Sequence, residues 1–254
     1  MSTGESENTL KNWGFLIVLA LVWGSSFILI KRGLNVFSPG ELGAYRIVAA
    51  ATFLLPLSIP KVKNLKSHQI QNLILVGLVG SFIPAFLFAK AQTQLSSSLT
   101  GVLNALTPLS VVLVGAIFFN SKITRRNAIG LFIAFLGVVV LVTVKEGSGF
   151  GAFSDINAYA FFVILACTCY GFNLNLIKFR FVELKPVEIT AISLLMVLPA
   201  ALIYLMAGTQ FSYKLVSVEG AWTALGYVTL LGVLGTALAL IIFNMMVKTA
   251  SPVF

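Results

Sequence analysis

The side chains in this sequence that could bind a polar ligand lie inside long apolar stretches. Arg46 is one of them and belongs to the apolar run 42–59. If this run crosses a bilayer, a guanidinium there costs about 3 kcal/mol unless it faces a cavity or a partner. We therefore expect Arg46 to recognise an anionic group or to act as a gate in a central cavity. A structural role stays open, because Arg46 lies about one and a half turns from the expected helix start, within reach of the interface and of helix-terminal carbonyls.

A row of polar residues occupies the apolar run 99–119. Thr100, Asn104, Thr107 and Ser110 follow one another at spacings of four, three and three residues, which places them on one face of a helix. A polar face on an apolar helix must contact water or other protein groups. It therefore either lines a cavity or forms hydrogen bonds with neighbouring helices, as Ser, Thr and Asn commonly do in membranes.

Two aromatic residues each share a helix face with a polar residue. Trp23 and Ser26 form the first pair, and Tyr170 and Asn173 form the second pair 147 residues later. Asn175 lies about 200° around the helix from Asn173, so we favour Asn173 as the cavity residue. Ordinary packing and substrate contact both remain open for the aromatic residues. The candidate cavity-lining residues are Trp23, Ser26, Tyr45, Arg46, Asn104, Thr107, Tyr170 and Asn173.

The residue patterns of an enzyme or a metal site are missing from the sequence. His68 is the only histidine and lies in a basic loop, and no H-E-x-x-H or G-x-S-x-G motif occurs. Cys167 and Cys169 are two residues apart, so a helix would point them to different faces. The glycine-rich run 147–151 lacks the preceding strand of a phosphate-binding loop and is typical of a flexible linker. We therefore expect no enzymatic activity, no cofactor and no bound metal.

The glutamates Glu41 and Glu188 occupy matching places at two expected helix starts. Ser38, Pro39 and Glu41 have the form of a capping box, with Ser at the cap, Pro at the first helical position and Glu at the third. Pro186 and Glu188 repeat the last two parts of this pattern. Helix capping is therefore favoured over a pair of proton carriers.

The composition requires a membrane. The 254 residues are 58% hydrophobic and 10% charged, with a mean hydropathy of +0.99, whereas about 25% of the residues in a soluble domain are charged. So few charged groups cannot cover a surface that faces water. At about 1.5 Å per residue, eight apolar stretches are long enough to cross the bilayer. They run over 13–30, 42–59, 70–89, 99–119, 128–144, 158–177, 187–208 and 222–247.

The distribution of basic residues predicts the orientation. Eleven Lys and Arg residues fall in the N-terminal tail and the loops on its side, against five in the loops on the other side, while Arg46 lies within a span. By the positive-inside rule, residues 1–12 form a cytoplasmic tail. The same flanking residues account for the net charge of +9, so nucleic-acid binding is not expected.

The chain contains a second copy of its first part. Residues 23–31 align with 170–178 at an offset of 147, and farther on the offset becomes 155, where Gly80 falls on Gly235. The first copy spans five helices over 13–144. Since five is odd, the second copy enters the membrane upside down, which is the inverted repeat of many transporters.

Residues 145–157 are the expected linker between the copies, and 158–254 are the second copy. That copy contains helices six to eight and the start of helix nine. We therefore expect an all-α polytopic membrane protein of ten helices whose second repeat is truncated after helix eight. A natural eight-helix variant is the alternative.

Several of these segments together resemble the EamA family of the drug/metabolite transporter superfamily. Trp-Gly-Ser-Ser-Phe at 23–27, Ser-Pro-Gly-Glu at 38–41 running into Arg46, and Leu-Thr-Pro at 106–108 carry the resemblance, as do the glycines of 130–137 and the run 231–239. The resemblance implies two inverted five-helix halves around a central cavity, in a bacterial inner membrane, moving small metabolites, often outward. One departure is Asn120-Ser121, where the family usually has Gly-Glu.

These features favour a transporter that exports or facilitates the movement of amino acids or related compounds by alternating access. The expected partners are a small-molecule substrate and the lipid bilayer, with a monomer as the default and the oligomeric state open. A cation/proton antiporter of the small-multidrug type is one alternative, but no Asp or Glu lies deep in any of the eight spans. A non-transporting scaffold or sensor is another, and it would leave the polar face of helix four dry.

Overall fold

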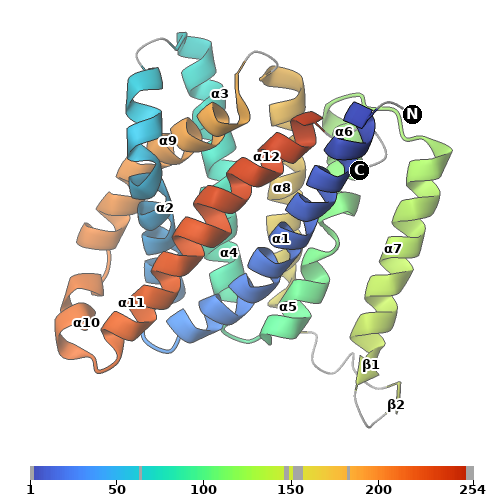
Figure 1. Ribbon diagram of the computed structural model, residues 1–254. Helices are drawn as coiled ribbons and strands as arrows, with labels where there is room; N and C mark the ends of the chain where they lie inside the picture. Colours follow the sequence, from blue (N-terminus) through green and yellow to red (C-terminus); the bar gives the residue numbers. More distant parts are fainter. Residues whose placement is uncertain (1–2, 63–64, 146–148, 151–156, 182–183, 250–254) are drawn as a thin grey trace.

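The computed structural model describes residues 3–62, 65–145, 149–150, 157–181 and 184–249. Long apolar helices run alternately up and down and form one bundle (Figure 1). In chain order the elements are α1 (Thr3–Gly33), α2 (Pro39–Val62), α3 (Ser67–Gly77), η1 (Leu78–Phe82), α4 (Ile83–Ala91), α5 (Ser97–Asn104), α6 (Thr107–Phe118), α7 (Arg125–Thr143), β1 (Val144–Lys145), β2 (Gly149–Phe150), α8 (Ala160–Arg180), α9 (Pro186–Ala207), α10 (Phe211–Ser217), α11 (Ala221–Leu230), η3 (Leu231–Leu238) and α12 (Ala239–Thr249).

The protein is an all-helical, multi-pass membrane protein. In the described part of the chain, seven helical segments are long and apolar enough to cross a bilayer, and they overlap almost completely with seven of the eight predicted stretches. The eighth stretch forms α7, in which residues Asn127–Leu141 make a shorter apolar helix. The strands β1 and β2 are two residues each and pair with one another. Of the expected linker, residues 146–148 and 151–156 lie outside the described part.

The first helix begins earlier than the apolar run predicts. The predicted tail 1–12 is helical from Thr3 onward, and only the part of α1 from Asn12 to Gly33 qualifies as a membrane span. A helix that is already nucleated in an apolar span extends at a low cost per residue, which accounts for this longer helix.

The predicted helix over 99–119 is broken in the middle of the span. It ends as α5 at Asn104 and begins again as α6 at Thr107. Pro108 explains the break, because it has no N–H with which to bond the carbonyl of Asn104 four residues earlier. The hydroxyl of Thr107 donates to that carbonyl instead, at 2.8 Å.

Two other spans contain wide π-helical turns. The turn η1 continues α3 and the turn η3 continues α11. At the repeat offset of 155 residues, η1 falls within η3. Pro84 follows η1 and lacks the N–H that a regular helix would use there, whereas η3 contains no proline. Such turns are often found at functional sites.

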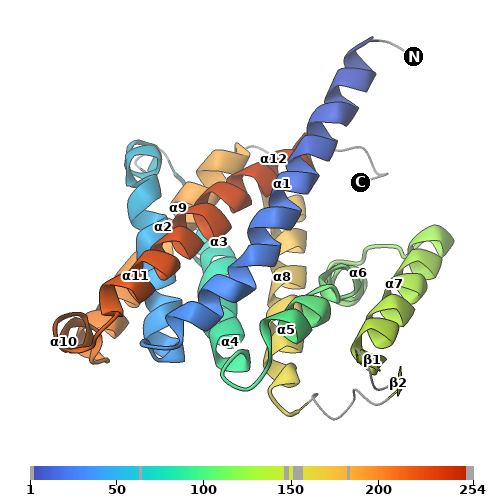
Figure 2. The same cartoon turned by 60° about the horizontal axis from the view of Figure 1, so that its bottom comes forward.

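The most extensive helix contact in the bundle is between α2 and α9, which run antiparallel. Their shared apolar core includes Ile47, Leu54, Leu194 and Val197, all fully or nearly fully buried. The helix α1 lies against α11, η3 and α12, while α8 lies against α4 and α6. Among the main helices, α7 has the fewest neighbours, and it stands at the edge of the bundle next to α5 and α6 (Figures 1 and 2).

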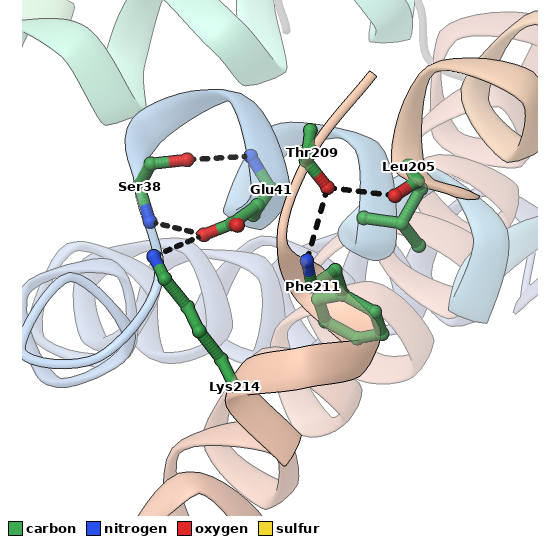
Figure 3. Close-up of polar contacts among 6 residues, drawn as sticks. All are labelled: Ser38, Glu41, Leu205, Thr209, Phe211 and Lys214. Atoms are coloured by element: carbon green, nitrogen blue, oxygen red, sulfur yellow. Dashed lines mark hydrogen bonds and ion pairs between the residues drawn. The ribbon is translucent and has the colours of Figure 1, made fainter. Parts of the chain in front are cut away.

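Capping glutamates tie the two ends of the α2–α9 pair together. At one end, Ser38 N–H donates to the Glu41 carboxylate at 2.7 Å, Glu41 N–H donates to the Ser38 hydroxyl at 3.3 Å, and Lys214 Nζ pairs with the same carboxylate at 2.7 Å (Figure 3). At the other end, Lys185 N–H donates to Glu188 at 3.1 Å and Lys61 pairs with Glu188 at 3.1 Å. Each glutamate therefore caps its own helix and binds a lysine at or beyond the far end of the other helix.

The short helix α10 is fastened to the start of α2 beside Lys214. The Phe211 ring packs against the rings of Phe37 and Tyr45, each at 5.2 Å between centroids. Thr209 holds the chain just before α10, because its hydroxyl donates to the Leu205 carbonyl at 2.6 Å and accepts from Phe211 N–H at 3.2 Å (Figure 3). This end of the bundle is thus closed by both aromatic and ionic contacts.

We expect the two ion pairs to differ in their contribution to stability. Glu41 and Lys214 have side chains that are 3% and 23% exposed, whereas Glu188 and Lys61 are 18% and 53% exposed. Glu41→Gln leaves a largely buried ammonium unpaired and should lower the free energy of unfolding by about 1–3 kcal/mol, since removing one partner of a buried pair is costly. Glu188→Gln should cost less than about 1 kcal/mol.

Thermal unfolding of the purified protein in detergent tests this difference. Glu219→Gln is the control, because Glu219 is exposed and the substitution removes the same charge. Equal losses for Glu41→Gln and Glu188→Gln would contradict the expected ranking.

Candidate functional site

A central cavity of about 490 Å³ lies among the helices. Residues of α1, α2, α4, α5, α6, α8 and α12 line it, together with the two wide turns η1 and η3. Its wall is mostly apolar. The polar side chains that line it are Trp23, Ser26, Arg46, Ser81, Asn104, Thr107, Tyr170, Asn173 and Thr236.

Seven of the eight candidate residues line this cavity, and Tyr45 does not. The Tyr45 ring stacks on Phe211, and its hydroxyl lies 2.9 Å from the hydroxyl of Thr229. Neighbouring residues on a helix point about 100° apart, so a helix that turns Arg46 toward the cavity turns Tyr45 away. Among the candidate residues, Tyr45 thus packs at the start of α2 and lies outside the cavity wall.

Arg46 presents its charge to the cavity. Its Nε donates to the hydroxyl of Thr236 at 2.7 Å. Among the described residues no other side-chain hydrogen bond and no ion pair reaches the guanidinium, and those that line the cavity include no Asp or Glu. Because a guanidinium has five N–H donors, those on the two Nη atoms remain for a ligand. This placement agrees with the cavity interpretation of Arg46 rather than with extension to the interface.

Asn173 is buried in the cavity wall. In the described part of the chain its side-chain oxygen has no hydrogen-bond partner. It lies so close to Gly80 that a Cβ there would come within 2.5 Å of Asn173 Cγ. Asn175 differs, because its amide donates to the carbonyls of Val111 at 2.9 Å and Gly171 at 2.8 Å. Asn175 thus joins two helices, while the Asn173 oxygen is buried without a hydrogen-bond partner among the described residues.

The polar atoms of Trp23 and Ser26 form hydrogen bonds with other groups of the protein. The indole N–H of Trp23 donates to the Gly235 carbonyl at 3.1 Å, and the ring lies 5.4 Å from that of Phe243. The Ser26 hydroxyl donates to the Val22 carbonyl at 2.7 Å. These residues therefore shape the cavity with their apolar surfaces. Gly235 lies against Ser26 in the same way that Gly80 lies against Asn173.

The polar row of the fourth span is divided between two roles. Asn104 and Thr107 line the cavity at the helix break, where the Thr107 hydroxyl also lies 3.4 Å from the sulfur of Cys167. Thr100 is buried and donates to the Ser96 carbonyl at 2.9 Å, and Ser110 is not part of the cavity wall. Thr107 thus both lines the cavity and contacts a neighbouring helix, whereas the hydrogen bond of Thr100 stays within its own helix.

Sequence reasoning missed two polar residues of the wall, Ser81 and Thr236. Both are nearly buried and lie in the wide turns. Each directly follows a glycine of the repeated pair Gly80 and Gly235, so the Gly-Ser and Gly-Thr dipeptides were the available signal. A comparison restricted to identical residues overlooks them, because Ser and Thr differ.

Comparison with known proteins places the chain in a family. The sequence profile described as the EamA-like transporter family matches residues 12–143, which is just over half of the chain. The chain belongs to the EamA-like transporter family. In this family member Asn120, which occupies the usual glycine position after the fourth span, has a φ of 51°. Asparagine tolerates this left-handed conformation better than most residues do, which explains the replacement.

Curated relatives of this EamA-like chain are named as transporters. An "Uncharacterized transporter" of Archaeoglobus fulgidus is 30% identical over 132 residues, covering 52% of this chain and 48% of the relative. A "Probable amino-acid metabolite efflux pump" of Salmonella typhimurium is also 30% identical over 132 residues, covering 51% of this chain and 42% of the relative. The chain spans about half the length of the curated relatives it matches.

A solved crystal structure has a similar fold. It superposes with a TM-score of 0.58 over 97% of this chain and 80% of the other, at 18% sequence identity. At this level of identity the likeness concerns the fold alone. Family and relatives point to a transporter rather than an enzyme. Among the residues that the structure describes, no group of three or more His, Cys, Asp or Glu could hold a metal ion.

Proposed function

We propose that the protein transports amino acids or related small metabolites by alternating access, and that the substrate binds in the central cavity. The observation that carries this proposal is the Arg46 guanidinium, which faces the cavity without a neutralising acid among the described wall residues. A buried cation of this kind is stabilised by an anionic ligand, and a carboxylate matches its planar donors.

The remaining wall fits the rest of an amino acid. Polar wall side chains such as Asn104 and Thr107 are hydrogen-bond partners for the ammonium group, and the aromatic and aliphatic wall surrounds an apolar side chain. A volume of about 490 Å³ lies within the usual range of about 300–1,000 Å³ for small-molecule sites. The name of the Salmonella typhimurium relative, an amino-acid metabolite efflux pump, agrees with this substrate class.

Reciprocal contacts support alternating access between two inverted repeats, over 13–144 and 158–254 with a linker at 145–157. Glu41 binds Lys214, and its repeat equivalent Glu188 binds Lys61. Such reciprocity is expected when a pseudo-twofold axis in the membrane plane exchanges the halves, and the exchange supplies two similar packings, one open to each side.

The proposed setting is a bacterial inner membrane with the N-terminus in the cytoplasm. The N-terminal end of α1 lies at the same end of the bundle as the connection from α2 to α3 (Figure 1). That connection is rich in lysine, which supports a cytoplasmic assignment of this end by the positive-inside rule.

A cation/proton antiporter fits the cavity less well. Within the described wall the only ionised group is a cation, Arg46, and it repels cationic substrates. A scaffold without transport supplies no anion for the charge of Arg46, which no acid in the described wall neutralises. This charge favours a transported ligand with a carboxylate.

Uptake into proteoliposomes tests the proposal. We expect radiolabelled amino acids from a broad panel to exchange across the membrane, at a rate above that of protein-free vesicles. Amino-acid amides, which lack the carboxylate, should compete at least about tenfold less well, because a hydrogen-bonded charge pair is worth about 1.5–3 kcal/mol. Absence of exchange across the panel, or equal competition by acids and amides, would overturn it.

A further inference from the structure

We infer that Thr236 is a positioning residue for Arg46 and that the wide turn η3 brings it into place, so that a carboxylate binds end-on between the two Nη atoms. The inference rests on the proposed function for its ligand. Its structural core, the Arg46–Thr236 contact, can be tested without any transport.

The hydroxyl of Thr236 is directed by the π-helical turn in which it lies. Thr236 is 2% exposed, and its hydroxyl donates to the carbonyl of Leu231 at 3.4 Å, five residues earlier. This five-residue spacing is that of a π-helix and not of an α-helix. Because the proton points to Leu231, the oxygen's lone pairs are left to accept from Arg46 Nε, at 2.7 Å.

The same turn also holds the backbone of Arg46. Gly232 lies against this part of α2, and a Cβ at Gly232 would come within 2.7 Å of the Arg46 carbonyl oxygen. The next glycine of the turn, Gly235, accepts the indole N–H of Trp23. One turn of η3 therefore fixes Arg46 at both its backbone and its Nε, and braces Trp23 of α1 beside it.

The contact at Nε decides how a ligand can bind. A guanidinium can pair with a carboxylate either side-on, through Nε and one Nη, or end-on, through both Nη atoms. Thr236 occupies Nε, which leaves the end-on edge for the cavity. A planar anion with two oxygens, such as a carboxylate, is therefore favoured over a single-oxygen acceptor.

The second repeat has no charged residue at the position equivalent to Arg46. At the repeat offsets, Thr236 corresponds to Ser81 and Arg46 corresponds to Ser193. The Ser193 hydroxyl donates to the Thr190 carbonyl at 3.1 Å in its own helix. The cavity thus has one carboxylate position, next to η3, and not a symmetric pair.

Nuclear magnetic resonance of protein labelled with ¹⁵N at arginine Nε tests the positioning directly. The Arg46 Nε–H signal, assigned by its loss in Arg46→Lys, should be protected from solvent exchange in the wild type and in Thr236→Ser. It should lose that protection in Thr236→Val, which keeps the shape but removes the acceptor. Thr229→Val is the matched control, because Thr229 contacts Tyr45 and not Arg46.

Transport kinetics in proteoliposomes supply the second readout, with L-leucine and L-leucinamide as probes once exchange of leucine is established. Thr236→Val should raise the KM for leucine about tenfold with little change in the maximal rate, and should reduce the preference for leucine over its amide. Thr236→Ser should restore both. If Thr236→Val does not fold, Thr236→Ala takes its place.

The two readouts separate the possible failures. Unchanged protection of Arg46 Nε–H in Thr236→Val, or an unchanged KM in that variant, would overturn the inference while leaving transport intact. Absence of exchange by the wild type with every amino acid would overturn the proposed function, while the resonance experiment would still decide the role of Thr236.

Discussion

Replacing Arg46 by lysine is expected to impair transport nearly as much as replacing it by alanine. Lysine keeps the positive charge but lacks the planar pair of Nη donors, so its single nitrogen cannot form the two parallel hydrogen bonds that a guanidinium gives a carboxylate. Losing a buried, charge-assisted pair costs about 2–3 kcal/mol, which corresponds to about 30- to 150-fold in transport efficiency. The measurement is the ratio of maximal rate to KM for amino-acid exchange in proteoliposomes with equal amounts of inserted protein.

Arg32→Lys is the control for this experiment. Arg32 is exposed at the end of α1, where a long side chain with a charged head is sufficient. Full activity of Arg46→Lys would exclude Arg46 from substrate binding. Asn104, Thr107 and Asn173 would then remain as the polar groups that orient the ligand.

A large loss of stability is expected from substitution of Gly171, where α8 packs against α6. A Cβ at this position would lie 2.7 Å from the carbonyl oxygen of Ser110 and 2.9 Å from its carbon. These are backbone atoms of a helix, so they cannot rotate away as a side chain could. Gly171→Ala should therefore push α6 from α8 and lower the free energy of unfolding by about 1–3 kcal/mol, the usual cost of overpacking. Thermal unfolding in detergent measures the loss.

Gly24→Ala provides a matched control at the repeat-equivalent position. In the described part of the chain nothing lies within 4 Å of a Cβ built on Gly24. Alanine also favours a helix over glycine by about 1 kcal/mol, so this variant should be neutral or slightly stabilising. If Gly171→Ala were as stable as Gly24→Ala, the close approach of α6 and α8 would not matter for stability.

The membrane spans could be predicted from the sequence, whereas the breaks within them could not. A span needs only length and apolar composition, which are local properties. A proline in the sequence does not by itself show whether a helix is broken. Pro56, Pro60 and Pro199 lie inside uninterrupted helices, while the helix is broken just before Pro108. At that break the hydroxyl of Thr107 bonds the released Asn104 carbonyl, a local substitute that helical periodicity does not reveal.

The cavity was predictable to the extent that polar residues in apolar helices must face something polar. This rule selects Arg46, Asn104 and Asn173, and all three lie in the wall of the cavity. It fails for Tyr45, whose hydroxyl is satisfied by a neighbouring helix instead. The rule also does not predict Thr236 as a cavity residue. A wide turn rotates the residues that follow it and so changes which side chains share a helix face.

The unequal exposure of the two ion pairs gives the α2–α9 pair two ends of different character. Dissolved ions screen charges in water over about 8 Å at physiological ionic strength, but they act much less on charges that water does not reach. Lys61 is open to the surrounding solution, while Glu41 is covered by protein. The salt concentration on one side of the membrane therefore changes the attraction between Lys61 and Glu188 at one end of this helix pair. The attraction between Glu41 and Lys214 at the other end stays nearly constant when the salt concentration changes.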